Sequence, residues 1–228
     1  MEIRQMGFLL DGFRSLPRHG LGGVAVLLLY VLQGEVRFGA RARSHSAASS
    51  DRGSTIAVSL AAALPVLGFV LAMKTDWFRG APLPGMPAIA WGGVALGGLG
   101  LAVRIWAVLT LRERYTRTLL IQAEHSVERR GPYRWVRHPG YLGSLLSLNG
   151  VAAASGSLVV LIASLAATLA GYAYRIRVED EMLIQRFGEA YAAYRREVAT
   201  LIPWTAGLAR LRSPGWSKKG GRKRNRSR

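Results

Sequence analysis

Residues 138–174 read HPGYLGSLLSLNGVAAASGSLVVLIASLAATLAGYAY, a run of 37 residues with no Asp, Glu, Lys or Arg. As a single helix this run would be about 55 Å long at about 1.5 Å per residue, whereas the hydrocarbon core of a membrane is about 30 Å thick. The run must therefore fold back on itself. Residues 149–157, NGVAAASGS, are rich in Gly, Ser and Asn and predict the turn. We expect a hairpin of two membrane helices of about 17 residues each.

Three further apolar segments precede this hairpin. Residues 54–73 and 80–103 contain 20 and 24 residues without a charge, enough for a helix to span a membrane. Residues 21–33 are fewer and form a crossing only if His19, Gly20 and Gly34 extend them. Together the segments predict an all-α integral membrane protein with about five transmembrane helices, the last two forming the C-terminal hairpin. A soluble helical protein is excluded because three stretches reach spanning length, and the glycines that follow Trp91 predict closely packed helices.

The arginines of the connecting segments predict the orientation of these helices. Residues 37–53 contain four arginines and residues 112–137 contain seven, whereas residues 74–87 contain only one arginine and one lysine. Because short cytoplasmic loops are enriched in Lys and Arg, the first two segments are expected on the cytoplasmic side, to which the hairpin then returns the chain. The arginines before residue 21 would lie on the opposite side, against this rule.

Composition limits the partners and the chemistry. The net charge is +18, and residues 217–228 (SKKGGRKRNRSR) contain seven Lys or Arg. Beside membrane helices, such a tail fits anionic lipid headgroups, and nucleic acid is not expected. The chain has no cysteine, and its four histidines share no metal-ligand spacing, so neither disulfides nor a metal site is expected. We predict an N-terminal membrane scaffold over 1–87, a functional core over 88–204 and a disordered basic tail over 205–228.

The two ends of the predicted hairpin must be neighbours at one membrane surface. They carry polar side chains on both sides: Arg137, His138 and Tyr141 at the entrance, and Arg175, Arg177, Glu179 and Asp180 at the exit. Arg175 and Glu179 share a helix face, whereas Asp180 points about 100° away. The cluster fits a proton-abstracting pair, a structural Arg175–Glu179 salt bridge, or a site in which carboxylate and guanidinium hold ligand groups of opposite charge.

Other polar and aromatic residues leave two interpretations open. Arg104, near the end of the third crossing, is either functional or extended toward the membrane interface. Tyr133, Trp135 and Tyr141 form either an interfacial aromatic belt or the wall of a pocket. Residues 175–204 predict one amphipathic helix that continues out of the final crossing and lies over the membrane surface, closed by Pro203 and weakened at Gly188. Its apolar face comprises Met182, Leu183, Phe187, Tyr191 and Tyr194.

Two motifs separated by the hairpin carry a family resemblance. Gln122, His125 and GPYRWVRHPGYLG (131–143) form the first, and RIRVEDEMLIQRFGEAYAAYRREVATLIP (175–203) forms the second. This series resembles the isoprenylcysteine carboxyl methyltransferase family of integral membrane methyltransferases, which is related to phospholipid N-methyltransferases. The resemblance covers about residues 91–204, whereas the N-terminal half contributes only hydropathy.

The resemblance implies S-adenosylmethionine as methyl donor, bound in a cytoplasmic pocket without a Rossmann sheet. It implies Arg175 and Glu179 as the catalytic pair, with Arg175 orienting the carboxylate of a lipophilic, isoprenylcysteine-like acceptor. Arg104 is added as a candidate substrate-binding residue. The residues expected around the cofactor are Gln122, His125, Ser126, Val127, Glu128, Tyr133, His138, Pro139, Gly140, Tyr141 and Glu179.

Departures from the family pattern leave the acceptor open. Asp180 stands where the family usually has Glu, and residues 116–121 match only loosely. The partners expected are a lipophilic or prenylated substrate and membrane lipids. The competing functions are a phospholipid N-methyltransferase, a nicotinamide-dependent membrane reductase, and a membrane protein without catalysis whose motifs are interfacial anchors.

Overall fold

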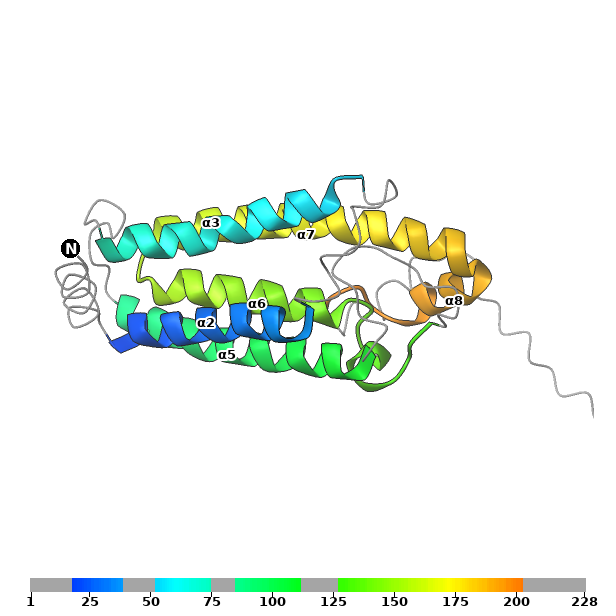
Figure 1. Cartoon of the computed structure of the whole chain (residues 1–228), viewed down its shortest axis with the longest axis horizontal. Helices are drawn as coiled ribbons and strands as arrows, with labels where there is room; N and C mark the ends of the chain where they lie inside the picture. Colours follow the sequence, from blue (N-terminus) through cyan, green and yellow to red (C-terminus); the bar gives the residue numbers. More distant parts are fainter. Residues whose placement is uncertain (1–17, 39–51, 75–84, 112–126, 203–228) are drawn as a thin grey trace, which may run out of the picture.

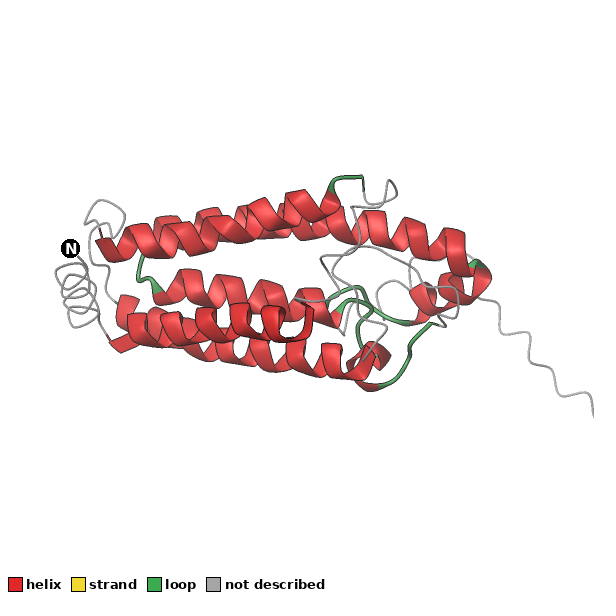
Figure 2. Ribbon diagram, viewed as in Figure 1, coloured by secondary structure: helices red, strands yellow, loops and turns green. Residues whose placement is uncertain are grey.

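The computed structural model describes residues 18–38, 52–74, 85–111 and 127–202. Their elements, in chain order, are α2 (Arg18–Phe38), α3 (Ser54–Lys74), α5 (Met86–Leu111), the short 3-10 helix η4 (Gly131–Arg134), α6 (Pro139–Ala154), α7 (Leu158–Phe187) and α8 (Glu189–Glu197). Figure 2 shows no strand in these ranges, where Val136 and Ala199 form an isolated parallel β-bridge. The predicted all-helical class is therefore confirmed for the described residues. The basic tail and three predicted cofactor residues (Gln122, His125 and Ser126) lie outside them, and the boundaries at 87 and 204 stay a prediction.

Helices α6 and α7 form the predicted hairpin. The turn is shorter than expected, because α6 runs to Ala154 and the chain reverses over 155–157, where Gly156 has a φ of 72°. Ser157 then begins α7 by accepting the N–H of Val160 at 3.3 Å. Asn149 stays helical because its amide is held within the hairpin, donating to the Leu145 carbonyl at 2.8 Å and to Thr168 Oγ1 at 3.0 Å. The second helix continues beyond the hairpin to Phe187, as predicted for the segment that follows the last crossing, since no residue breaks it before Gly188.

Helices α5 and α6 are packed backbone to backbone, as the glycines predicted. A Cβ atom added at Gly100 would lie 2.5 Å from the Ser147 nitrogen and 2.7 Å from the Gly143 carbonyl oxygen. Small residues permit this approach where no hydrophobic effect drives helices together within lipid. The contact fixes the entrance of the hairpin against α5.

Three helices are long and apolar enough to cross a membrane by length and composition: Ser54–Ala72, Pro87–Leu111 and Leu158–Phe187. The apolar part of α2, Gly20–Val31, is shorter, and α6 has 16 residues. The protein is therefore an integral membrane protein with three candidate spans among the described residues, and the count of five crossings stays a prediction. In Figure 1, α3 and α7 lie along one side of the bundle and α2, α5 and α6 along the other.

The predicted single helix over 175–204 is wrong in two respects. Gly188 adopts a φ of 54°, a left-handed conformation that suits glycine, so α7 ends at Phe187 and α8 follows in a new direction. Helix α8 then ends at Glu197, before Pro203. The chain after it returns to the hairpin entrance, where the Arg137 N–H donates to the Ala199 carbonyl at 2.8 Å and the His138 N–H to the Thr200 carbonyl at 3.2 Å.

Candidate functional site

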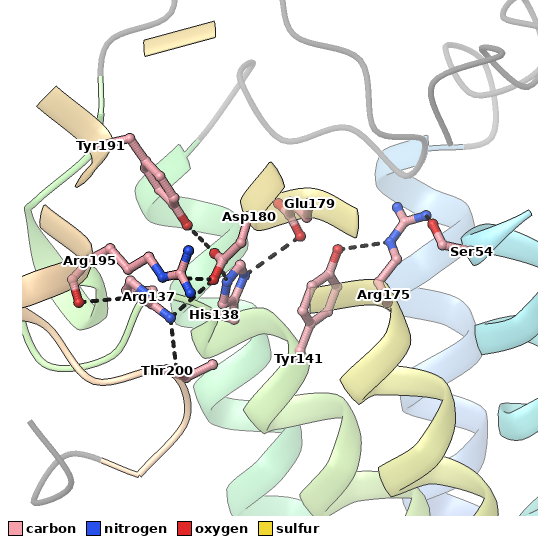
Figure 3. A network of polar contacts seen from close by, with 10 residues as sticks. All are labelled: Ser54, Arg137, His138, Tyr141, Arg175, Glu179, Asp180, Tyr191, Arg195 and Thr200. Atoms are coloured by element: carbon pink, nitrogen blue, oxygen red, sulfur yellow. Dashed lines mark hydrogen bonds and ion pairs between the residues drawn. The ribbon is translucent and has the colours of Figure 1, made fainter. Parts of the chain in front are cut away.

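His138 is the centre of a polar cluster where the two ends of the hairpin meet (Figure 3). It caps the N-terminus of α6, and its Nε2 lies 3.0 Å from Asp180 Oδ1 on α7. Its Nδ1 faces Glu179 Oε2 at 3.6 Å. The two neighbouring carboxylates, expected to point in different directions, thus flank opposite edges of one imidazole ring. A ring with a carboxylate at each nitrogen is best satisfied when both nitrogens carry a proton.

The charge of His138 follows from these neighbours. Burial lowers the pKa of His138, but the carboxylates of Asp180 and Glu179 outweigh it and raise the pKa from 6.5 to about 9. The side chain is only 4% exposed. His138 is therefore a buried imidazolium at neutral pH, and each carboxylate has a cationic neighbour.

Asp180 joins four segments of the chain. Besides His138, it accepts from Arg137 Nη2 at 3.1 Å and from the Tyr191 hydroxyl of α8. Arg137 in turn donates to Thr200 Oγ1 at 2.8 Å and to the Arg195 carbonyl at 3.1 Å. Burial and the Asp180 charge raise the pKa of Tyr191, so its hydroxyl stays protonated and donates. Asp180 is therefore a structural centre that closes α8 and the segment after it over the hairpin.

Glu179 differs from Asp180 in having unused acceptor capacity. Its Oε2 is buried and has no hydrogen-bond partner among the described residues, although the side chain as a whole is 24% exposed. A buried carboxylate oxygen in this condition is costly unless a ligand donates to it. Glu179 is therefore the described side chain best suited to hold an N–H, an O–H or a positive charge of a ligand.

Arg175 lies on the other side of Tyr141 from His138 (Figure 3). Its Nε donates to Tyr141 Oη at 3.0 Å, and the tyrosine ring is stacked on His138 with 5.5 Å between centroids. Its Nη1 donates to two hydroxyls of α3, Ser54 Oγ at 2.9 Å and Thr55 Oγ1 at 2.7 Å. The described hydrogen bonds of Arg175 thus run to three hydroxyls, those of Tyr141, Ser54 and Thr55.

Arg104 is buried between helices, which argues against its extension toward the interface. Its Nη1 donates to the Gly140 carbonyl at 3.3 Å and to the Ser144 hydroxyl. Its guanidinium also lies over the Tyr30 ring of α2, 5.1 Å from the centroid. Arg104 therefore ties α2 and α5 to the first turn of α6, next to Tyr141.

The predicted residues before the hairpin are only partly described. Tyr133 is buried in η4, and its carbonyl accepts the Tyr194 hydroxyl at 2.6 Å. Glu128 accepts from Arg130 Nε at 3.0 Å, beside the half-buried Val127. The aromatic residues divide between the two interpretations: Trp135 is 47% exposed, as in an interfacial belt, whereas Tyr133 and Tyr141 lie inward.

Several residues of the cluster were missed by sequence reasoning. Tyr191 and Tyr194 were assigned to an apolar helix face, but both hydroxyls donate hydrogen bonds, to Asp180 and to the Tyr133 carbonyl. Ser54 and Thr55 lie in a half of the chain in which no chemistry was recognised. Their spacing to Arg175, 121 and 120 residues, produces no local pattern.

These features define a class: a helical membrane protein whose polar site lies where the two ends of a membrane hairpin meet. Comparison with known proteins identifies the family that it resembles. Residues 94–185 match the model of the isoprenylcysteine carboxyl methyltransferase (ICMT) family. The resemblance predicted from the two motifs is thereby confirmed over these residues.

Individual relatives agree with this match. The chain is 33% identical over 137 residues to a protein-S-isoprenylcysteine O-methyltransferase of Tribolium castaneum, covering 54% of this chain and 46% of that protein. It is also 33% identical over 114 residues to the cobalt-zinc-cadmium resistance protein CzcN of Cupriavidus metallidurans, covering 48% and 49%. The chain thus spans about half the length of the curated relatives it matches.

A solved structure shares the fold. It is the eukaryotic intramembrane Ras methyltransferase ICMT, solved without a monobody. The structural match covers 81% of this chain and 66% of the chain of that structure, with a TM-score of 0.54. At 20% sequence identity, this likeness concerns the fold alone. It agrees with the helical membrane architecture described above.

Proposed function

We propose that the protein is a membrane methyltransferase that transfers a methyl group from S-adenosylmethionine to a lipophilic acceptor, specifically the carboxylate of an isoprenylcysteine-like molecule. The observation that carries this proposal is the buried Oε2 of Glu179, which faces His138 Nδ1 at 3.6 Å but has no described hydrogen bond, in the same cluster as the guanidinium of Arg175. The names of most matched relatives and the family match support the same activity.

The proposed donor fits the chemistry of the cluster. S-adenosylmethionine supplies an electrophilic methyl group on a sulfonium centre, and it also carries an ammonium group and ribose hydroxyls. Glu179 Oε2 has no described hydrogen bond and can accept one from such groups, and His138, held between Glu179 and Asp180, fixes the position of that carboxylate. We assign cofactor binding to Glu179 with the run His138, Pro139, Gly140 and Tyr141, and to Gln122, His125, Ser126, Val127, Glu128 and Tyr133.

The acceptor is assigned to the other side of Tyr141. A guanidinium is suited to a carboxylate because its planar N–H groups match the two oxygens, and we infer that Arg175 orients the acceptor carboxylate. A carboxylate is already a nucleophile, so the reaction requires no general base and no covalent intermediate on the protein. Catalysis then consists of holding the acceptor in line with the methyl group and excluding water. Arg104, 9% exposed, supports the first turn of α6 at the edge of this acceptor side.

We place the site on the cytoplasmic side of the membrane. Seven exposed arginines surround it: Arg129, Arg130, Arg134, Arg177, Arg186, Arg195 and Arg196. The described turn at the opposite end, 155–157, has no charged residue. This asymmetry follows the enrichment of cytoplasmic loops in basic residues.

Calorimetric titration of purified variants with S-adenosylhomocysteine tests the donor assignment. We expect Glu179→Ala to abolish binding, Arg175→Ala to retain it, and the control Glu181→Gln, in an exposed ion pair with Arg52, to bind as the wild type does. Unchanged binding by Glu179→Ala would contradict the assignment. Binding of reduced nicotinamide instead would indicate a reductase.

Transfer of a labelled methyl group into total lipid and small prenylcysteine analogues tests the acceptor. A product labile to base is an ester and supports carboxyl methylation, whereas a stable product indicates an amine acceptor such as a phospholipid headgroup. Arg175→Ala should lower transfer to the carboxylate acceptor while leaving S-adenosylhomocysteine binding intact.

A further inference from the structure

Tyr141 of α6 lies between the two charged residues of the proposed reaction (Figure 3). Its hydroxyl oxygen accepts the Arg175 Nε–H at 3.0 Å, and the same hydroxyl interacts with the Glu179 carboxylate. A hydroxyl has one proton to donate and lone pairs that accept, so it can accept from a guanidinium and donate to a carboxylate at the same time. One neutral group on α6 is therefore shared by a cation and an anion of α7.

The positions of Arg175 and Glu179 on α7 explain why a single side chain reaches both. The two residues are four apart, so they lie one turn from each other on one face of the helix. Both contact the start of α6, Arg175 through Tyr141 and Glu179 through His138. The distance between the guanidinium and the carboxylate therefore depends on what lies between them at this end of α6.

The Tyr141 ring is itself held from two directions. It is stacked on His138, with 10° between the ring planes and 5.5 Å between the centroids. It also lies 5.4 Å from the Tyr172 ring of α7, at an angle of 48°. These contacts involve the ring and not the hydroxyl, so a phenylalanine at this position would retain them.

The reaction proposed above places opposite charges on the two sides of this hydroxyl. An oxygen of the acceptor carboxylate forms a bond to the methyl carbon while the bond from that carbon to the sulfonium sulfur breaks, and its electron pair stays on sulfur. A cation and an anion thus become a neutral thioether and a neutral ester. The rate of such a displacement depends on the relative position of the two reactants, and a misplacement of about 1 Å can lower it about a hundredfold.

We propose that Tyr141 is a positioning residue whose hydroxyl sets the distance between the Arg175 guanidinium and the Glu179 carboxylate, and thereby aligns the acceptor with the methyl group. This inference rests on the function proposed above, in which Arg175 orients the acceptor and Glu179 holds the donor. Each ligand keeps its own charged partner when the hydroxyl is removed, so both still bind, but their alignment is loosened. The loss is therefore expected in kcat and not in either KM.

The test is transfer of a labelled methyl group from S-adenosylmethionine to N-acetyl-S-farnesylcysteine by the purified full chain in lipid nanodiscs. We expect Tyr141→Phe to lower kcat about tenfold, with both KM values and the affinity for S-adenosylhomocysteine within about twofold of the wild type. Tyr174→Phe is the matched control, because it removes a neighbouring tyrosine hydroxyl that donates to the Arg52 carbonyl at 2.8 Å. This control should leave kcat unchanged.

A double-mutant cycle shows whether Tyr141 acts through Arg175. Arg175→Lys keeps a positive charge but removes the Nε–H that the Tyr141 hydroxyl accepts. We expect the loss of kcat in the Tyr141→Phe/Arg175→Lys double variant to be smaller than the product of the losses in the two single variants, because both remove the same hydrogen bond.

Each other outcome counts against a stated claim. An unchanged kcat in Tyr141→Phe overturns the inference, as do losses that multiply in the cycle. A loss of S-adenosylhomocysteine affinity as large as the loss of kcat also overturns it, because the hydroxyl would then serve donor binding or the fold. A wild-type protein that binds S-adenosylhomocysteine but does not methylate the carboxylate overturns the proposed acceptor and this inference with it.

Discussion

Replacing Asp180 by Asn should destabilise the protein strongly, because two buried cations depend on this carboxylate. Its oxygens lie 3.0 Å from His138 Nε2 and 3.1 Å from Arg137 Nη2. At an effective dielectric constant of about 20, each pair is worth about 5 kcal/mol of attraction before desolvation is subtracted. Removing one member of a buried ion pair costs about 3–5 kcal/mol, since its partners stay buried without compensation. Asn keeps the size of the side chain but presents an N–H₂ group to neighbours that are themselves donors.

The assay is thermal unfolding in detergent, followed by tryptophan fluorescence. For a chain of this size, about 3–5 kcal/mol lowers the melting temperature by about 6 °C or more. The matched control is Glu181→Gln on the next position of α7, whose pair with Arg52 is exposed by 46% and 58% and should contribute at most about 1 kcal/mol. A melting temperature for Asp180→Asn within about 2 °C of this control, a shift that corresponds to at most about 1 kcal/mol, would refute the view of Asp180 as the centre of the cluster.

Three further predictions concern the same cluster and the close contact between α5 and α6. The stability of the protein should fall as pH rises, because the pKa of His138 is raised from 6.5 to about 9. The imidazolium contributes about 3 kcal/mol to stability. This contribution is complete below pH 6.5 and is lost by about pH 9. Unfolding measured across this range should show the decrease, and a His138→Gln variant should lack it. Gly100→Ala should cost about 1–3 kcal/mol by forcing α5 from α6, whereas Gly98→Ala, where nothing lies within 4 Å, should be neutral or stabilising in the same melts. Tyr191→Phe should lower the free energy of unfolding by about 1.5–3 kcal/mol, the range for a hydrogen bond to a charged group. An unchanged stability would show that the Tyr191 hydroxyl does not contribute to the cluster.

The hairpin and the neighbouring positions of its ends were predictable, whereas the closure of the site was not. A run of 37 uncharged residues exceeds one crossing, so the chain had to turn, and the turn had to bring His138 near Glu179. The change of direction between α7 and α8 depends on the backbone conformation of one residue, Gly188, which sequence periodicity does not reveal. Tyrosines fit an apolar face and a hydrogen-bond network equally well, so the role of Tyr191 can be recognised only when the position of Asp180 is known. The contact of Ser54 with Arg175 joins two segments with no shared motif.

The backbone bridge between Val136 and Ala199 also has a consequence for the order in which the protein is made. Helices α2, α3, α5, α6 and α7 can enter the membrane and pack on one another during synthesis, because the contacts among them involve only residues already translated. The entrance to α6 is closed only when residues 199 and 200, 62 positions later, have left the ribosome and reached the Arg137 and His138 N–H groups. Such a non-local step is slow compared with helix packing. The nascent protein is therefore at first an inserted helix bundle that is open at the end of the polar site. The polar site is the last part of the protein to form.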